Sequence, residues 1–153
     1  MCGSKRSQAG FTLVELVSVL VLIGILAAVA VPRLTGLRAF DEVGFLNETQ
    51  AVLRYAQKTA IASRRTVCVA FTAATATLTI ASAAGVAACD TPLAGPTGET
   101  PPYAVSARNS GATYSPIPAN FSFNALGQPS NAQTIAMTGV GAVTVEAETG
   151  YVH

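Results

Sequence analysis

The stretch "QAGFTLVELVSVLVLIGILAAVAVP", from Gln8 to Pro32, decides the fold that we expect for this chain. Its apolar part begins at Phe11, and no residue from Leu16 to Val31 carries a charge. As a helix, about twenty such residues span a hydrocarbon core of roughly 30 Å. The sequence therefore predicts a membrane-spanning helix near the N-terminus.

Glu15 is the exception within this run, because it lies only four residues after Phe11. A carboxylate costs roughly 2.5–3.5 kcal/mol at the bilayer centre on insertion scales. A secretory signal peptide is one alternative, since "AVA" at residues 28–30 offers a cleavage site of the A-x-A kind. However, the run exceeds the usual h-region of about 7–15 residues, and a disposable apolar segment needs no acid.

The residues around Glu15 resemble a known motif. "GFTLVEL", from Gly10 to Leu16, is similar to the processing motif of type IV pilins and of the pseudopilins of type II secretion. The resemblance implies a leader over residues 1–10, which prepilin peptidase cuts between Gly10 and Phe11 before the new N-terminus is methylated. Glu15 then takes the place of the family's acidic residue, and Pro32 that of its helix-kinking proline.

The resemblance also offers a reason for Glu15. After cleavage, Phe11 would carry a cationic amine in an apolar environment, and Glu15 of a neighbouring subunit could neutralise it. This pair would favour subunit addition and set the axial register. The alternative is that Glu15 lies near the lipid headgroups and reaches water. The implied partners are prepilin peptidase, the major and other minor pilins of a hetero-oligomeric filament, and an inner-membrane assembly platform. The implied location is the inner membrane, crossed once with a periplasmic head, and then the filament.

A helical pattern continues beyond Pro32. Apolar residues recur there at spacings of three, four and seven, namely Val43, Leu46, Leu53, Ala56 and Ala60. We expect one helix over residues 11–62, kinked near Pro32, with a transmembrane and assembly half at 11–32 and an amphipathic half at 33–62. A β-rich globular head follows at 63–153. The predicted fold class is α+β: a pilin fold in which a long N-terminal helix packs on an antiparallel sheet.

Strand-like segments follow Arg65. "TVCVAFT" and "ATLTIAS" predict a hairpin, and residues 85–102 predict a loop because they are rich in Gly, Pro and Thr. Further strands are expected near residues 103–107, 120–123, 134–138 and 142–146. "LRYAQKTAIASRRTVCVAF", "FSFNALGQP" and "AVTVEAETGYV" resemble segments of GspH/FimT-type minor pilins and pseudopilins, and most of all those encoded with mannose-sensitive haemagglutinin-type pili.

The three cysteines are Cys2, Cys68 and Cys89. Cys2 lies in the expected leader, so an even pair remains, as one disulfide in an oxidising compartment would require. We predict a bond between Cys68 and Cys89, with two buried free thiols as the alternative. No C-x-x-C or Cys/His cluster occurs, and the sequence therefore predicts no metal site and no cofactor.

The sequence predicts a structural protein, not an enzyme, because it lacks G-x-S-x-G and Gly-rich phosphate-loop motifs. The net charge is +1, and it becomes −1 without Lys5 and Arg6 of the leader. A FimT-like DNA receptor is an alternative, but from Thr66 onward Arg108 is the only basic side chain. Since DNA binding needs many cations, we expect no nucleic-acid partner. A membrane-anchored head that never assembles is a third reading.

Overall fold

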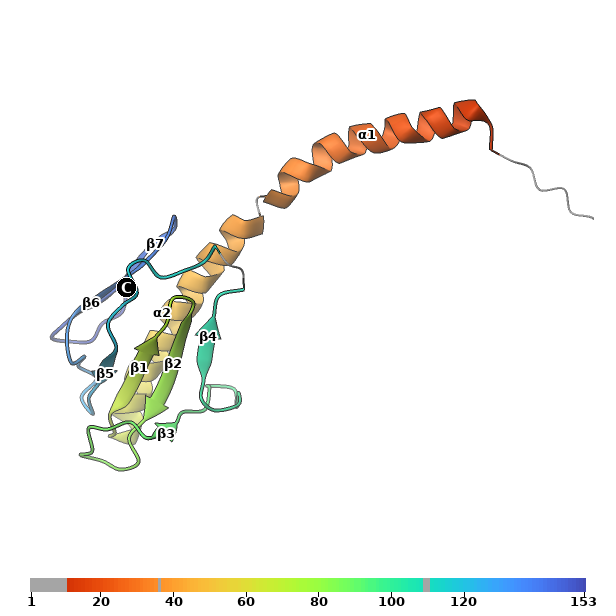
Figure 1. Ribbon diagram of the computed structural model, residues 1–153. Coiled ribbons are helices and arrows are strands. Elements are labelled where there is room, and N and C mark those ends of the chain that lie inside the picture. Colours follow the sequence, from red (N-terminus) through yellow and green to blue (C-terminus); the bar gives the residue numbers. More distant parts are fainter. Residues whose placement is uncertain (1–10, 36, 109–110) are drawn as a thin grey trace, which may run out of the picture. The chain divides into compact units, whose positions relative to one another are not determined.

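The chain forms two compact units, residues 1–37 and 38–153. The computed structural model describes residues 11–35, 37–108 and 111–153 (Figure 1). The helix expected over residues 11–62 is present as two helices, α1 at Leu13–Thr35 and α2 at Leu37–Ser63. Because α1 continues through Pro32, the proline does not end the helix, and a kink there stays a prediction. Among the described residues, no helix combines the length and the hydropathy that crossing a membrane requires.

One face of α2 supplies the helical side of the core. Its buried residues recur every three or four positions, as expected for a helix with one covered face, and they are Phe45, Thr49, Val52, Leu53, Ala56 and Ala60. The predicted stripe was right from Leu53 onward and wrong at Val43, which is 46% exposed. The buried face starts at Phe45 and includes the polar Thr49, which an apolar pattern cannot identify.

Arg64 ends α2 in the left-handed conformation, with a φ of 53°. The N–H of Arg65 donates to the carbonyl of Ala60 at 3.2 Å, which satisfies one of the last carbonyls of the helix. This turn sends the chain back along α2 into the first strand.

The predicted hairpin is present as β1 at Val67–Phe71 and β2 at Thr75–Ile80, paired from Val67 with Ile80 to Phe71 with Ala76. Buried and more exposed residues alternate along both strands, so one sheet face covers the core. In Figure 1, α2 lies behind β1 and β2.

Three short strands complete this sheet. β5 at Phe121–Phe123 pairs with the free edge of β1, and both β3 at Thr91–Pro92 and β4 at Ala104–Ser106 pair with β2. The segment predicted as a loop over residues 85–102 therefore contains a strand, β3. Its two residues are too few to show an alternating pattern in the sequence.

A second sheet holds β6 at Gln133–Met137 and β7 at Gly141–Val145. The end of the chain lies along β7, where Thr144 and His153 exchange backbone hydrogen bonds of 2.8 and 3.0 Å. The antiparallel sheet expected from the sequence is thus two sheets, and both contribute buried side chains to one core with α2.

The core contains one buried polar pair. Thr49 donates to the carbonyl of Phe45 at 2.8 Å, so its oxygen is left to accept from the hydroxyl of Tyr114 at 2.9 Å. Tyr114 also contacts the rings of Phe45 and Phe71, at centroid distances of 5.1 and 5.3 Å. Burial raises the pKa of Tyr114 to about 12.

Candidate functional site

The start of α1 is capped by Thr12. The side-chain oxygen of Thr12 accepts from the N–H of Glu15 at 3.2 Å, and its carbonyl accepts from the N–H of Leu16 at 3.1 Å. Thr12 is therefore the N-cap, and Glu15 lies in the first turn, where the helix dipole favours a carboxylate. The Thr-x-x-Glu spacing is that of a capping box, a local signal that could have placed the start of the helix from the sequence.

The apolar side chains of α1 are exposed. Phe11 is 84% exposed, and so are the leucine, valine and isoleucine side chains on every side of the helix from Leu13 to Val29. A helix that is apolar all round is normally covered by lipid or by other helices. The surface of α1 is therefore of the kind that lipid or other helices cover.

The carboxylate of Glu15 is exposed at the beginning of this apolar surface. Within the residues that the structure describes, neither of the two ion pairs involves Glu15. A carboxylate placed in this way can accept a cation from another molecule, and the fixed first turn of α1 defines its position along the helix.

This region also matches a known family model. Residues 5–31 match the model of the prokaryotic N-terminal methylation motif. This match supports a type IV pilin-like prepilin. No curated protein and no solved structure matches the chain. The prepilin motif implies processing by prepilin peptidase, anchoring in a membrane and assembly with pilins, and proteins that carry it are structural subunits.

The matched segment contains three of the predicted site residues. Gly10 lies outside the described residues, whereas Phe11 and Glu15 are described and lie four residues apart, with Phe11 just before the start of α1. Pro32 is the residue that follows the match. Cleavage after Gly10 and a pairing role for Glu15 stay predictions for this prepilin.

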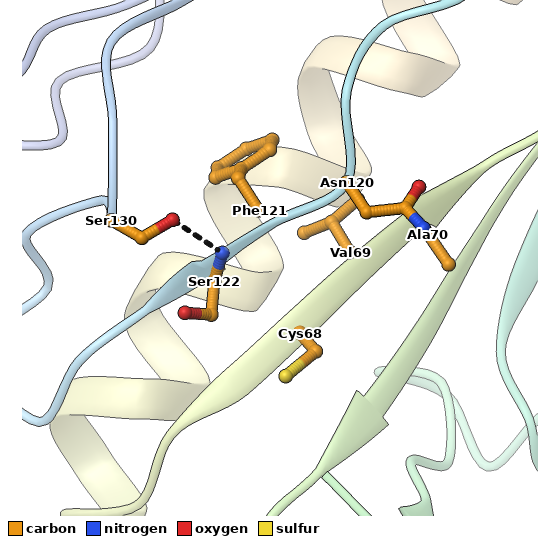
Figure 2. Close-up of a pocket in the computed structure, with 7 residues that line it drawn as sticks. All are labelled: Cys68, Val69, Ala70, Asn120, Phe121, Ser122 and Ser130. Carbon is orange, nitrogen blue, oxygen red and sulfur yellow. Dashed lines mark hydrogen bonds between the residues drawn. The ribbon is translucent and has the colours of Figure 1, made fainter. Parts of the chain in front are cut away.

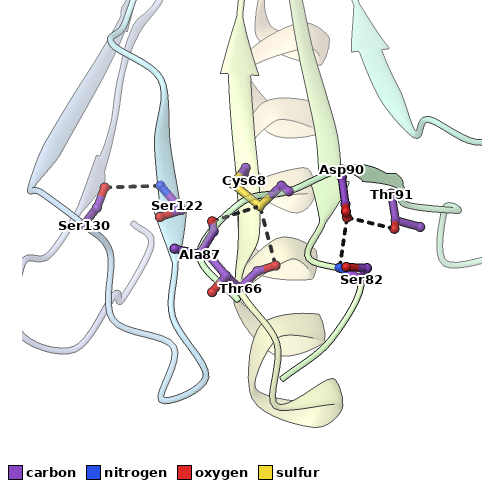
Figure 3. The surroundings of a disulfide bond; sticks show 9 residues. Thr66, Cys68, Ser82, Ala87, Asp90, Thr91, Ser122 and Ser130 are labelled. Atoms are coloured by element: carbon purple, nitrogen blue, oxygen red, sulfur yellow. Dashed lines mark hydrogen bonds between the residues drawn. A yellow bond between two sulfur atoms is a disulfide. The ribbon is translucent and has the colours of Figure 1, made fainter. Parts of the chain in front are cut away.

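The predicted disulfide between Cys68 and Cys89 is confirmed, with an S–S distance of 2.03 Å and a Cα–Cα distance of 6.0 Å. Cys68 belongs to the central strand β1, and Cys89 to the loop between β2 and β3. Figure 3 shows the bond on the sheet, with Ser122 and Ser130 on one side. The disulfide holds this exposed loop of the head against β1.

A shallow hollow of about 320 Å³ lies beside the disulfide, between β1 and β5 (Figure 2). Its lining residues are Cys68, Val69, Ala70, Asn120, Phe121, Ser122 and Ser130. The amide of Asn120 already accepts from the N–H of Phe71 at 2.8 Å, and Ser130 accepts from the N–H of Ser122 at 3.2 Å. Because this lining holds no titratable side chain, it offers no general acid or base.

Two polar residues of α2 hold the end of the chain in place. Arg54 donates to the carbonyl of Val152 at 3.0 and 3.2 Å. Gln57 donates to the carbonyls of Thr149 at 2.9 Å and Gly127 at 3.2 Å. The helical pattern places both residues outside the apolar stripe and predicts no role for them, because in a sequence a polar side chain bound to a distant backbone looks the same as a solvated one.

Proposed function

We propose that this chain is a GspH/FimT-type minor pilin or pseudopilin that joins a type IV pilus or a type II secretion pseudopilus near its tip and initiates assembly. The prepilin motif at residues 5–31, continued by the exposed apolar helix α1, carries the proposal. The resemblance of residues 53–71, 121–129 and 142–152 to that subtype, and to pilins of the mannose-sensitive haemagglutinin kind, gives the finer assignment.

In this proposal, prepilin peptidase removes residues 1–10, and Phe11 becomes the methylated N-terminus. Its amine is neutralised by Glu15 of an adjacent subunit, because each charge alone is costly in apolar surroundings. Residues 11–32 anchor the subunit in the inner membrane and then pack against other pilins. The disulfide supports a periplasmic head, since such bonds persist in oxidising compartments.

Glu15 also supports a place below the extreme tip. A subunit with nothing ahead of it has no neighbouring amine to neutralise, so it has no need for this acid. We therefore place the chain in a small initiating complex of minor pilins, where it contacts the assembly platform before the major pilins are added.

The test is Glu15→Leu in cells, with Ser18→Ala as the matched control. Glu15→Leu should be inserted and cleaved normally, since removing a charge makes insertion easier. It should no longer co-purify with the other pilins, because the neighbouring amine is left unpaired. Among the described residues, the hydroxyl of Ser18 bonds to the carbonyl of Glu15 alone, at 2.9 Å, so Ser18→Ala should behave as the unchanged protein. Normal incorporation of Glu15→Leu would refute the pairing.

We prefer this filament role to DNA uptake because of the surroundings of Arg108. It is the only basic side chain from Thr66 onward, and it forms an ion pair with Glu48. A partnered guanidinium contributes less to phosphate binding, which depends on several available cations. A clear shift of DNA by the protein at low salt would reverse this preference.

A further inference from the structure

The turn from Asn124 to Gln128 exposes a leucine on an ordered backbone. The side-chain oxygen of Asn124 accepts from the N–H groups of Leu126 and Gln128, at 2.9 and 3.0 Å. The N–H of Gly127 donates to the carbonyl of Asn124 at 2.9 Å, and Gly127 is itself buried. Leu126 is nevertheless 77% exposed. An apolar side chain on such an ordered turn loses little backbone entropy when it docks.

This turn is held against the last turns of α2. Gln57 donates to the carbonyl of Gly127 at 3.2 Å. Gly127 also packs so closely on Ile61 that a Cβ there would lie 2.6 Å from Cδ1 of Ile61. Because Ile61 is itself 47% exposed, it adds apolar surface next to the turn that carries Leu126.

A second apolar segment lies at the same end of the head. Residues 83–88 read "AAGVAA", and all six are exposed, Val86 by 36%. The disulfide at Cys89 fixes the end of this loop, and the Cys89 sulfur lies 3.6 Å from the carbonyl oxygen of Thr66, just beyond α2 (Figure 3). The loop and the leucine turn therefore both contact the region where α2 ends.

Three cations accompany these two apolar segments. Lys58 and Arg64 are exposed, whereas Arg65 is half-buried and donates to the carbonyl of Ala81 at 3.5 Å. In the part of the chain that the structure describes, neither ion pair involves one of these three side chains. Their charges are thus available to an anionic partner.

Two acids lie close to this surface. Asp90 follows the apolar loop, and Gln128 donates to the carbonyl of Glu148 at 3.1 Å, which brings Glu148 next to the leucine turn. Glu146 is already paired with His153. With Asp90 and Glu148 counted against the three cations, this end of the head is still positive.

The shape of this end favours a lipid surface over a protein as its partner. Its two apolar segments are exposed tips, and the two hollows described for this molecule lie elsewhere, between β1 and β5 and beside Phe40. A protein partner would need a matching hollow for each tip, whereas lipid headgroups rearrange around them. Cations next to exposed apolar side chains are typical of surfaces that bind the interface of an anionic bilayer.

We propose that this end of the head docks on an anionic phospholipid surface. Leu126 and Val86 enter the boundary between headgroups and acyl chains, while Lys58, Arg64 and Arg65 stay at the level of the phosphates. Each cation adds to the attraction, and salt weakens it. The contact goes beyond the proposed filament role, because it gives the head a lipid partner in addition to the pilins.

A tryptophan introduced into the turn tests the docking, because the chain itself contains none. The full chain with Leu126→Trp is reconstituted into vesicles of phosphatidylcholine alone, or of equal parts of phosphatidylcholine and phosphatidylglycerol. In the anionic vesicles we expect emission at shorter wavelength and loss of quenching by acrylamide, and added salt should reverse both. Identical emission in the two kinds of vesicle would overturn the proposal.

Ile117→Trp is the matched control. Ile117 is 55% exposed and lies three residues before Asn120, whose side chain accepts from the N–H of Phe71 at the far end of β1. Its emission should be the same in both kinds of vesicle. An equal shift at both positions would show adsorption of the whole head and would refute docking through this end.

Removal of charge gives a second measurement. Lys58→Gln together with Arg64→Asn, added to Leu126→Trp, should abolish the shift in anionic vesicles. Asparagine suits the second position because Arg64 has a φ of 53°, which asparagine tolerates. Arg108→Gln removes a cation that is paired with Glu48 and should leave the shift unchanged.

The remaining outcomes are equally decisive. A shift that survives the loss of Lys58 and Arg64 would refute the docking. A shift that also occurs in pure phosphatidylcholine would indicate contact between proteins and would refute a lipid partner. The Glu15 test is separate, because incorporation of Glu15→Leu is measured by co-purification with pilins and does not depend on the lipid contact of the head.

Discussion

The two helices of this chain differ in whether their apolar residues are buried. The apolar side chains of α1 are exposed on every side from Leu13 to Val29. In α2, Leu53, Ala56 and Ala60 are completely buried against the two sheets of the head. Hydrophobic burial inside one chain drives its folding, and burial between chains drives association. The burial in α2 indicates that this helix stabilises the head, whereas the prepilin motif that α1 carries implies a role in assembly.

The polar residues follow the same division. Arg54 and Gln57 of α2 bind carbonyls of their own head, at residues 152, 149 and 127. Glu15 of α1 has its backbone N–H bound to Thr12, but its carboxylate is exposed. Changes in α1 should therefore affect processing and assembly, and changes in α2 and the head should affect stability.

The largest expected effect concerns the leader. Gly10→Lys should abolish maturation, because a bulky cation replaces the small residue at the predicted scissile position. Mass analysis of the N-terminus should find mature protein that begins at methylated Phe11 for the unchanged chain and only precursor for the variant. Gln8→Lys, two residues away, is the control and should be processed. A mature start at Val31 would instead support a signal peptide, and it would contradict the assembly role that the comparison gives to α1.

Leucines on the two helices should differ in their contribution to stability. Leu53→Ala in α2 should lower the free energy of unfolding of the head by about 2–5 kcal/mol, because Leu53 is completely buried. Leu22→Ala in α1 is the matched control, and it should change this quantity by less than about 0.5 kcal/mol. Denaturant titration of the detergent-solubilised chain, followed by tyrosine circular dichroism, measures both. Equal losses would mean that α1 also stabilises the head.

The disulfide should contribute somewhat less than the core leucine. Its sequence separation of 21 residues corresponds to about 3 kcal/mol in the chain-entropy model. Cys89→Ser should lower the free energy of unfolding by that amount. In the unchanged protein, a thiol reagent should label Cys68 and Cys89 only after reduction. Full labelling of both without a reductant would show that the bond is absent in the cell.

Alkaline pH should weaken the head through Tyr114. The pKa of Tyr114 is raised from 10.0 to about 12 in the folded protein by burial. Because the pKa is higher in the folded state, Tyr114 contributes fully to the free energy of unfolding below pH 10. This contribution is lost as pH rises toward 12, because Tyr114 in the unfolded state releases its proton first. The loss should be on the order of 2–3 kcal/mol, at about 1.4 kcal/mol for each unit.

Tyr114→Phe separates this effect from that of the other tyrosines. The variant should remove most of the decrease in the free energy of unfolding between pH 10 and 12. The pKa of Tyr103 is also raised, first by burial and then by nearby Glu99, so a smaller dependence on pH should remain. An unchanged pH dependence in Tyr114→Phe would show that the pair with Thr49 is not protected from water.

Patterns within short segments were enough to predict much of the molecule. The β1–β2 hairpin follows from two alternating runs around a short turn, and the disulfide follows from an even pair of cysteines once Cys2 is set aside. The prepilin motif was recognised from seven contiguous residues, and the family match at residues 5–31 agrees with it. Each of these signals can be recognised from the order of residues along the chain.

The remaining features depended on residues far apart in the sequence. Nothing local distinguishes Val43, which is exposed, from Leu53, which is buried, because both fit the same helical period. Thr49 is buried because Tyr114, 65 residues away, supplies its hydrogen bond. The two-residue strand β3 forms because β2 offers a free edge.

The sequence by itself determined the prepilin segment, the α+β class and the pairing of Cys68 with Cys89, because a motif, a periodicity and an even cysteine count are properties of the chain alone. Only the tertiary structure decided which face of α2 is buried, that the strands divide into two sheets, and that Arg54 and Gln57 bind the end of the chain. The physical reason is that burial and backbone hydrogen bonding depend on which segments lie next to each other in the fold, and long-range packing decides this.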